Sequence, residues 1–295
     1  MLPLALLTAL SSWSLAVHGD VVSRFHDLPS CLEFFYRGSP PSGFVAVSQV
    51  HICQRFSGTV YYATLFDPAG RLPIYSAFIY KYRNLDITRG RGVDRAWKYE
   101  PQLAELQADG NMTEIGPAAL SDSAVRRSQA VGGKFPALPP KGDGPPHVRV
   151  MLNPANLQGS RASRSAAYTV TNAVAVPRPF YHKQWKPGLK DALSRIRQEC
   201  RQSAAYLVSG AVRGRRSRET WVPPVGKGRA ASPQLLWLAY CCSNGVSGAL
   251  LAQTPDPGEP AGSHRALSLG ELEEQLAARL GRRRIRIYQG GCSPL

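Results

Sequence analysis

The side chains best suited to chemistry in this chain lie between Arg149 and Trp185. Arg149 offers a permanent positive charge that could neutralise a phosphate or another oxyanion. Met151 has no basic lone pair, so it cannot take a proton from an attacking water. Between Gly144 and Lys190 there is no Asp or Glu, although Mg²⁺ prefers carboxylate and carbonyl oxygens. The segment therefore carries a cation for an anionic ligand but lacks the groups that would activate water.

Neighbouring polar residues are weak substitutes for these missing groups. His147 precedes Met151 by four residues, and on a strand the two would share a face but lie about 13 Å apart. His182 stands beside Tyr181, and a lone His in a polar loop is usually a surface residue. Asn172 could help to hold a water, but a strand-end Asn more often serves hydrogen bonding within the fold. We therefore expect no compensation from these residues.

Stretches rich in Val, Ile, Tyr and Phe predict the strands that must position this segment. Residues 57–65 and 72–82 are separated by Asp67-Pro68-Ala69-Gly70, a sequence typical of a turn. Three later runs read as buried strands: 204–212, 235–242 and 245–253.

Two helices are predicted by capping and periodicity. Lys186-Pro187 places a proline where a helix begins, and the residues after it form one apolar face that includes Cys200. Ser268 and Glu271 form a capping box before a leucine-rich helix. Cys200 is therefore expected to point inward, and the leucines of the last helix to pack in the core.

The first 19 residues predict a secretory signal peptide. They are apolar and contain no Asp, Glu, Lys or Arg before Asp20, and Val17 and Gly19 are small residues at cleavage-compatible spacing. The run is short for a membrane span, which makes an N-terminal anchor the less favoured alternative. The apolar run 235–242 is also too short to span a membrane. We expect a secreted mature domain of residues 20–295 with no membrane span.

Six cysteines fit an oxidising compartment, and their even number suggests up to three disulfides. Cys31 and Cys53 lie close together in the N-terminal part and are predicted to pair. The adjacent Cys241 and Cys242 are not expected to bond each other, because a vicinal ring is strained. Their side chains would point to opposite faces of a strand. One is therefore expected to meet Cys200 and the other Cys292.

Asn111-Met112-Thr113 is a good N-glycosylation sequon. It lies in a polar loop that contains Gly110, as an acceptor site usually does. Asn111 is therefore a candidate glycosylation site of an exported chain, although a sequon only permits the modification.

The formal net charge of +16 at pH 7 favours polyanionic partners. Nucleic acid, heparan-type glycans and anionic lipid surfaces are all candidates. Arg161 and Arg164 follow Arg149 in sequence, and the clusters Arg213–Arg218 and Arg282–Arg286 would add to the field if the fold brings them to the same face. The alternative is that these arginines are scattered, solvated and without a partner.

Motifs along most of the chain resemble one known family. Between Arg149 and Trp185 these motifs are Arg149, Leu152-Asn153-Pro154, the run from Tyr168 to Asn172 and the run from Phe180 to Trp185. Elsewhere they are Cys31 with residues 34–36, residues 52–54, the hairpin 61–82, Trp97, residues 100–102, and Asn111 with Met112. Together they resemble the DNA/RNA non-specific endonucleases, in particular the branch called endonuclease domain-containing 1 proteins.

The resemblance implies an α+β fold. We expect a mainly antiparallel central sheet, flanking helices and a ββα-metal-type finger over about residues 148–200, with Arg149–Asn153 and Tyr168–Asn172 as paired or neighbouring strands. Family members use a general-base His, a divalent cation and an Arg that neutralises the transition state. The His falls on Met151 and the metal-ligand Asn on Tyr181. Arg149 is kept, and Asn172 is a weak metal-ligand candidate.

These departures from the family's motif allow three hypotheses about function to be ranked. The first is a secreted, catalytically impaired nuclease-like protein without a cofactor, which binds nucleic acid, another polyanion or a protein partner through Arg149, Arg161 and Arg164. The second is an active non-specific DNA/RNA endonuclease that uses Mg²⁺ or Mn²⁺. The third is an extracellular structural module whose charge is incidental. The double loss at Met151 and Tyr181 favours the first.

Overall fold

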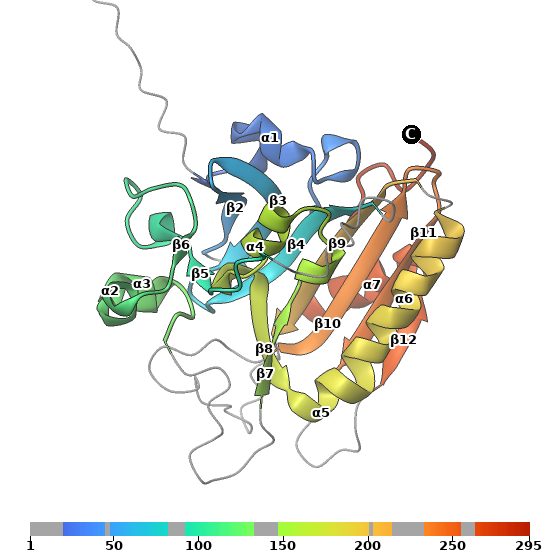
Figure 1. Cartoon of the computed structure of the whole chain (residues 1–295). Coiled ribbons are helices and arrows are strands. Elements are labelled where there is room, and N and C mark those ends of the chain that lie inside the picture. The colour runs from blue at the N-terminus through green and yellow to red at the C-terminus, as the bar shows by residue number, and fades with distance from the viewer. Residues whose placement is uncertain are drawn as a thin grey trace, which may run out of the picture.

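The computed structural model describes residues 20–44, 48–81, 92–132, 147–200, 203–213, 233–254 and 263–295 (Figure 1). Two sequence predictions lie outside these residues. They are the signal peptide 1–19 and the basic residues of the Arg213–Arg218 cluster that follow Arg213.

An eight-stranded antiparallel sheet forms the centre, in the order β1-β2-β3-β4-β9-β10-β11-β12. Its strands are β1 Val21–Val22, β2 Val50–Phe56, β3 Thr59–Asp67, β4 Leu72–Tyr80, β9 Ala205–Arg213, β10 Pro233–Cys242, β11 Ser247–Gln253 and β12 His264–Leu267. The predicted strands correspond to β3, β4, β9, β10 and β11, which confirms the antiparallel sheet. The edge strands β1 and β12 are short and carry no long apolar run, so periodicity did not identify them.

The sheet is buried on both faces, which explains why β10 reads as an unbroken apolar run. Successive β10 side chains enter different cores. Leu236, Leu238 and Cys242 pack in one, and Leu235, Trp237 and Cys241 pack in the other. The alternation follows from strand geometry, in which neighbouring side chains point to opposite faces.

Different elements cover the two faces (Figure 1). The first face carries a small hairpin of β7 His147–Met151 and β8 Ala173–Pro177, followed by α5 Arg178–Phe180, a π-helical turn Tyr181–Trp185 and α6 Lys186–Glu199. Helix α4 Arg161–Ala166 lies on this side as well. The second face carries α1 Pro29–Leu32, α7 Leu269–Leu280 and the C-terminal residues 285–288. This is the predicted α+β architecture with flanking helices.

The remaining elements are small. They are β5 Lys98–Tyr99, β6 Thr113–Glu114, α2 Pro117–Ser121, α3 Ser123–Ser128 and 3-10 turns at 25–27, 36–38, 101–103, 155–157 and 170–172. β5 and β6 pair with each other, and α2 and α3 enclose a small third core around Val125 and Val170.

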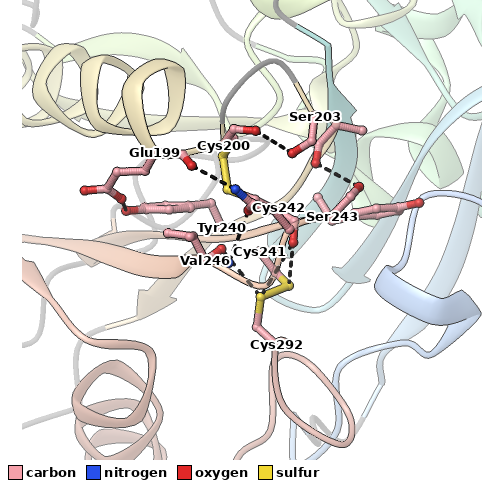
Figure 2. Close-up of a disulfide and its surroundings, with 12 residues drawn as sticks. Glu199, Cys200, Ser203, Tyr240, Cys241, Cys242, Ser243, Val246 and Cys292 are labelled. Atoms are coloured by element: carbon pink, nitrogen blue, oxygen red, sulfur yellow. Dashed lines mark hydrogen bonds between the residues drawn. A yellow bond between two sulfur atoms is a disulfide. The ribbon is translucent and has the colours of Figure 1, made fainter. Parts of the chain in front are cut away.

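Three disulfides join Cys31 to Cys53, Cys200 to Cys242 and Cys241 to Cys292. Figure 2 shows how neighbouring cysteines of β10 reach partners on opposite sides of the sheet: Cys200 at the end of α6 and Cys292 near the C-terminus. The predicted division of the cysteines is confirmed.

None of the helices in the described part of the chain has both the length and the apolar character needed to cross a membrane.

Candidate functional site

The hairpin β7–β8 and the helix after it form a ββα finger, as predicted. Arg149 faces Ala175 and Met151 faces Ala173 in the antiparallel register. The second strand is displaced from the prediction, because residues 170–172 form a 3-10 turn and β8 begins only at Ala173. The Leu152 amide nevertheless donates to the Asn172 carbonyl at 2.8 Å, which continues the hairpin ladder by one bond.

Asn172 is fully buried where the finger joins the sheet. Its Oδ1 accepts from the Asn153 amide at 2.9 Å and from Ser76 Oγ at 3.0 Å. Its Nδ2 donates to the carbonyls of Asn153 at 3.0 Å and Ala167 at 2.9 Å. An amide offers two donors and two acceptor lone pairs, so all four positions are used within the protein. Asn172 therefore connects the Leu152-Asn153-Pro154 turn, the β4 strand and the end of α4.

Arg149 rests on an aromatic side chain rather than projecting freely. Its Cζ lies 4.0 Å from the centroid of the Trp97 ring, and Trp97 makes an edge contact with Tyr168 at 5.7 Å. Burial lowers the Arg149 pKa to about 10, so the guanidinium stays charged at neutral pH. A cation on a tryptophan face is attracted by the negative face of the ring. The finger thus keeps its Arg as a half-buried, oriented cation.

Met151 and Tyr181 are the residues that the family resemblance aligns with the general base and the metal ligand. Met151 is half-buried at the end of β7. Tyr181 is half-buried in the π-helical turn, where it packs on the first core and makes an edge contact with the exposed His182 at 5.0 Å. His147 lies at the opposite end of β7 from Met151.

The donor set of the finger does not fit a divalent cation. Across the described residues there is no group of three or more His, Cys, Asp or Glu side chains that could hold a metal ion. The finger offers a thioether and a phenol where hard cations prefer carboxylate and carbonyl oxygens.

The other predicted arginines divide between several environments. Arg161 is exposed on α4, whereas Arg164 is 9 % exposed and its Nε donates to the Gln158 carbonyl at 3.0 Å. Arg213 lies 3.5 Å from Asp67. The condition under which Arg282–Arg286 would add to the field around Arg149 is not met, because this segment follows α7 on the opposite face of the sheet. There Arg286 pairs with the buried Glu273 at 2.6 Å.

The finger helix has a basic face that was not predicted from the sequence. Only its apolar face was predicted. Residues 178–199 contain six Lys or Arg side chains: Arg178, Lys183, Lys186, Lys190, Arg195 and Arg197. All six are exposed. Lys183, Lys186, Lys190 and Arg197 recur at i, i+3, i+7 and i+14, a helical spacing that is visible in the sequence and could have identified this face.

Few carboxylates offset this face. Residues 178–199 contain two, Asp191 and Glu199, and Glu199 accepts a hydrogen bond from the Tyr240 hydroxyl at 3.0 Å. Arg178, Lys183, Lys186 and Lys190 form no ion pair with another residue of the described ranges. The helix that follows the hairpin therefore presents six exposed cations and two exposed carboxylates, an excess of positive charge.

Asn111, the candidate glycosylation site, is half-buried in the loop before β6. Its Oδ1 accepts from the Gly58 amide at 2.8 Å, and its Nδ2 donates to Asp109 Oδ1 at 3.1 Å. The following Thr113 is exposed. Glycosylation at Asn111 stays a prediction.

Two known proteins are similar to this chain, and no family model matches it. The endonuclease domain-containing 1 protein of Mus musculus is 29% identical over 215 residues, which cover 72% of this chain and 38% of that protein. The Homo sapiens protein of the same name is 29% identical over 215 residues, covering 72% and 39%. The chain thus matches about two fifths of the length of these relatives. The chain is therefore similar to the endonuclease domain-containing 1 proteins, as its motifs predicted, and the ββα finger agrees with that similarity.

Proposed function

We propose that this chain is a catalytically impaired endonuclease-like domain that binds nucleic acid through the basic face of its finger helix and does not cleave it. The observation that carries the proposal is an intact ββα finger in which Met151 ends β7 and Tyr181 begins the π-helical turn. The family resemblance places the general base and the metal ligand at these two residues.

Hydrolysis of a phosphodiester at this finger would need a base for the attacking water. A thioether has no proton affinity at useful pH, and loss of a general base typically costs a factor of about 10²–10⁴ in rate. A phenol is a poor replacement for a metal-ligand amide, and the described residues hold no carboxylate cluster that would recruit the cation. Arg149 alone can attract a phosphate, but it cannot activate water.

The helix face supplies the binding surface. A helix rises 1.5 Å per residue, so the cations from Arg178 to Lys190 extend over roughly 18 Å. Duplex DNA carries one charge per about 1.7 Å of its axis, and each phosphate that is neutralised releases counterions. Phosphate contacts carry no sequence information, so we expect little sequence preference. The cations extend along the helix axis and are opposite in sign to the row of phosphates along a nucleic acid strand. This favours nucleic acid over a purely structural module.

The absence of cleavage is tested by nicking of supercoiled plasmid with Mg²⁺ or Mn²⁺, with and without chelator. We expect no chelator-sensitive nicking by the unaltered chain. The Met151→His/Tyr181→Asn variant should gain chelator-sensitive nicking, because it returns the base and the ligand to the finger. Cleavage by the unaltered chain that chelator and Arg149→Ala both abolish would refute the proposed impairment.

Binding is tested by titrating labelled duplex DNA at several salt concentrations. Lys186→Ala/Lys190→Ala should reduce the slope of log affinity against log salt by about 1.8, because each phosphate that a lysine neutralises contributes about 0.9 to that slope. Both lysines are exposed, and Ala is a good helix former, so the fold should persist.

The matched control is Arg283→Ala/Arg284→Ala, which removes the same charge from the opposite side of the sheet. An equal loss of affinity in both variants would mean that net charge, and not this face, is responsible. Affinity that does not change with salt would exclude nucleic acid. Retention on heparin without duplex binding would assign the face to a sulfated glycan.

A further inference from the structure

A buried polar cluster lies where the described chain begins, and the proposed function does not use it. Asp20 is 1 % exposed. Its backbone nitrogen donates to Gln102 Oε1 at 2.6 Å, and the Val21 amide donates to the same oxygen at 3.0 Å. The Asp20 carbonyl accepts from the Cys53 amide at 2.8 Å. The backbone of Asp20 is thus fixed between β2 and the turn after β5.

The charges of this cluster are out of balance. Asp20 Oδ1 accepts from Arg55 Nε at 2.5 Å, while Asp20 Oδ2 is buried and has no partner among the described residues. Glu100 is 1 % exposed, and from the described residues its carboxylate receives only long hydrogen bonds, from Thr169 at 3.5 Å and Thr171 at 3.4 Å. Asp109 adds further negative charge near Asp20. Arg55 therefore pairs with Asp20, while Glu100 has no ion-pair partner among the described residues.

We propose that Asp20 is the N-terminal residue of the mature protein and that its α-ammonium group is the missing buried cation of this cluster. The small residues Val17 and Gly19 place a signal-peptide cleavage point directly before Asp20. The structure adds an independent reason for that position, because the nitrogen that cleavage would release is buried against Gln102, on a residue whose own carboxylate has an unpaired buried oxygen.

The chemistry of the nitrogen changes on cleavage. A peptide nitrogen at Asp20 supplies one neutral donor, which Gln102 already accepts. An ammonium group supplies three donors and a positive charge. The two additional donors can serve the unpaired Asp20 Oδ2 and the Glu100 carboxylate, whose pKa is raised by burial and by the charge of Asp20. Because a signal peptide is removed from the exported chain before it folds, burial of this nitrogen does not prevent cleavage.

Processing would then stabilise the fold. β1 pairs Val21 with Ile52, and β2 carries Cys53 of the Cys31–Cys53 disulfide, so the new terminus would anchor this edge of the sheet. A buried charge whose partner is removed is strongly destabilising. A chain with a residue retained before Asp20 would keep Arg55 as the partner of Asp20 but would lack the second cation for Asp20 Oδ2 and Glu100.

The position of the terminus is tested on protein secreted from the full-length sequence. Mass spectrometry should find Asp20 as the first residue. In the folded protein its α-amine should resist acylation at neutral pH, whereas the same amine should react readily in denaturant. A different first residue, or an α-amine that reacts equally fast in both states, would overturn the proposal.

The ion pair is tested by comparing chains that begin at Asp20 and at Gly19. The added glycine restores a peptide bond at Asp20 and moves the charge outward by one residue. We expect the melting temperature to fall by about 5 °C, as for loss of a buried interaction in a chain of this size. In a Glu100→Gln background the added glycine should cost much less. Equal melting temperatures of the two chains, or an equal cost in both backgrounds, would show that the ammonium has no carboxylate partner.

The dependence on pH provides a signature that simple steric damage would not give. With a peptide bond at Asp20, burial raises the pKa of Asp20 to about 6 and that of Glu100 to about 8, even with Arg55 present. A carboxyl whose pKa is raised on folding destabilises the folded state as pH rises through that pKa. The chain that begins at Gly19 should therefore lose stability between about pH 4 and pH 8. The chain that begins at Asp20 should lose much less, and identical profiles would contradict the proposal.

Discussion

Replacing Asn172 with Ala should lower the free energy of unfolding by about 4 kcal/mol, because it leaves several buried partners without hydrogen bonds. The Asn153 amide and Ser76 Oγ lose their acceptor, and the carbonyls of Asn153 and Ala167 lose their donor. Each buried group left unsatisfied costs about 1–3 kcal/mol, and partial relaxation keeps the sum below the maximum.

Equilibrium unfolding in urea measures this loss, and Asn156→Ala provides the matched control. Asn156 lies close by in the 3-10 turn at 155–157 but is exposed, so its replacement should change stability by less than about 0.5 kcal/mol. A destabilisation below about 1 kcal/mol at Asn172 would mean that water replaces the amide. Asn172 would then not be the structural centre of the finger.

The role of Asn172 shows how far sequence reasoning can reach. Its residue type and its place after the Tyr168 segment were enough to favour hydrogen bonding over metal binding. Its partner Ser76 could not be predicted, because Ser76 is 96 positions away and belongs to another strand. Long-range polar contacts are set by how the finger docks on the sheet, which local pattern does not encode.

The helix boundaries on the finger show a second limit of prediction from the sequence. Lys186-Pro187 predicted the start of α6, and α6 does begin at Lys186, yet helical backbone extends back to Arg178. Pro179 gives an equally good start signal, since proline suits the first turn of a helix. The π-helical turn between them lies where the family's metal ligand would stand, and π-helical turns have no simple sequence signature.

The distribution of charge could be predicted in amount but not in place. The net charge of +16 is a property of the composition. The positions of Arg282–Arg286 behind the sheet, and of Lys183, Lys186 and Lys190 on the finger helix, depend on which face each helix covers. The topology decides this, and it separates cations that composition alone would add together.

Removing the Cys200–Cys242 disulfide by a double substitution to Ala should also lower the free energy of unfolding, by about 4 kcal/mol. The bond closes a loop with a sequence separation of 42, and constraint of the unfolded chain by a loop of that length is worth about 4 kcal/mol. Both cysteines are buried, so the loss of packing adds to this entropic effect.

The disulfide also fixes the finger helix. It joins the residue after α6 to the end of β10 in the centre of the sheet (Figure 2). The other end of the helical run is held by the buried Phe180 and Trp185. In the Cys200→Ala/Cys242→Ala variant we therefore expect amide exchange to increase in the last turns of α6, around Arg195 and Arg197, and not around Trp185.

Urea unfolding under non-reducing conditions measures the stability, and hydrogen exchange locates the change. Ser194→Ala is the control on the same helix, because Ser194 is exposed and its replacement should be nearly neutral. Duplex affinity at a temperature where the variant is folded should fall little, since Lys186 and Lys190 lie in the part of the helix that Trp185 still holds. A large loss of affinity would show that the far end of the helix, with Arg195 and Arg197, makes the main phosphate contacts. An unchanged stability would mean that packing of α6 alone, without the covalent link, fixes the finger on the sheet.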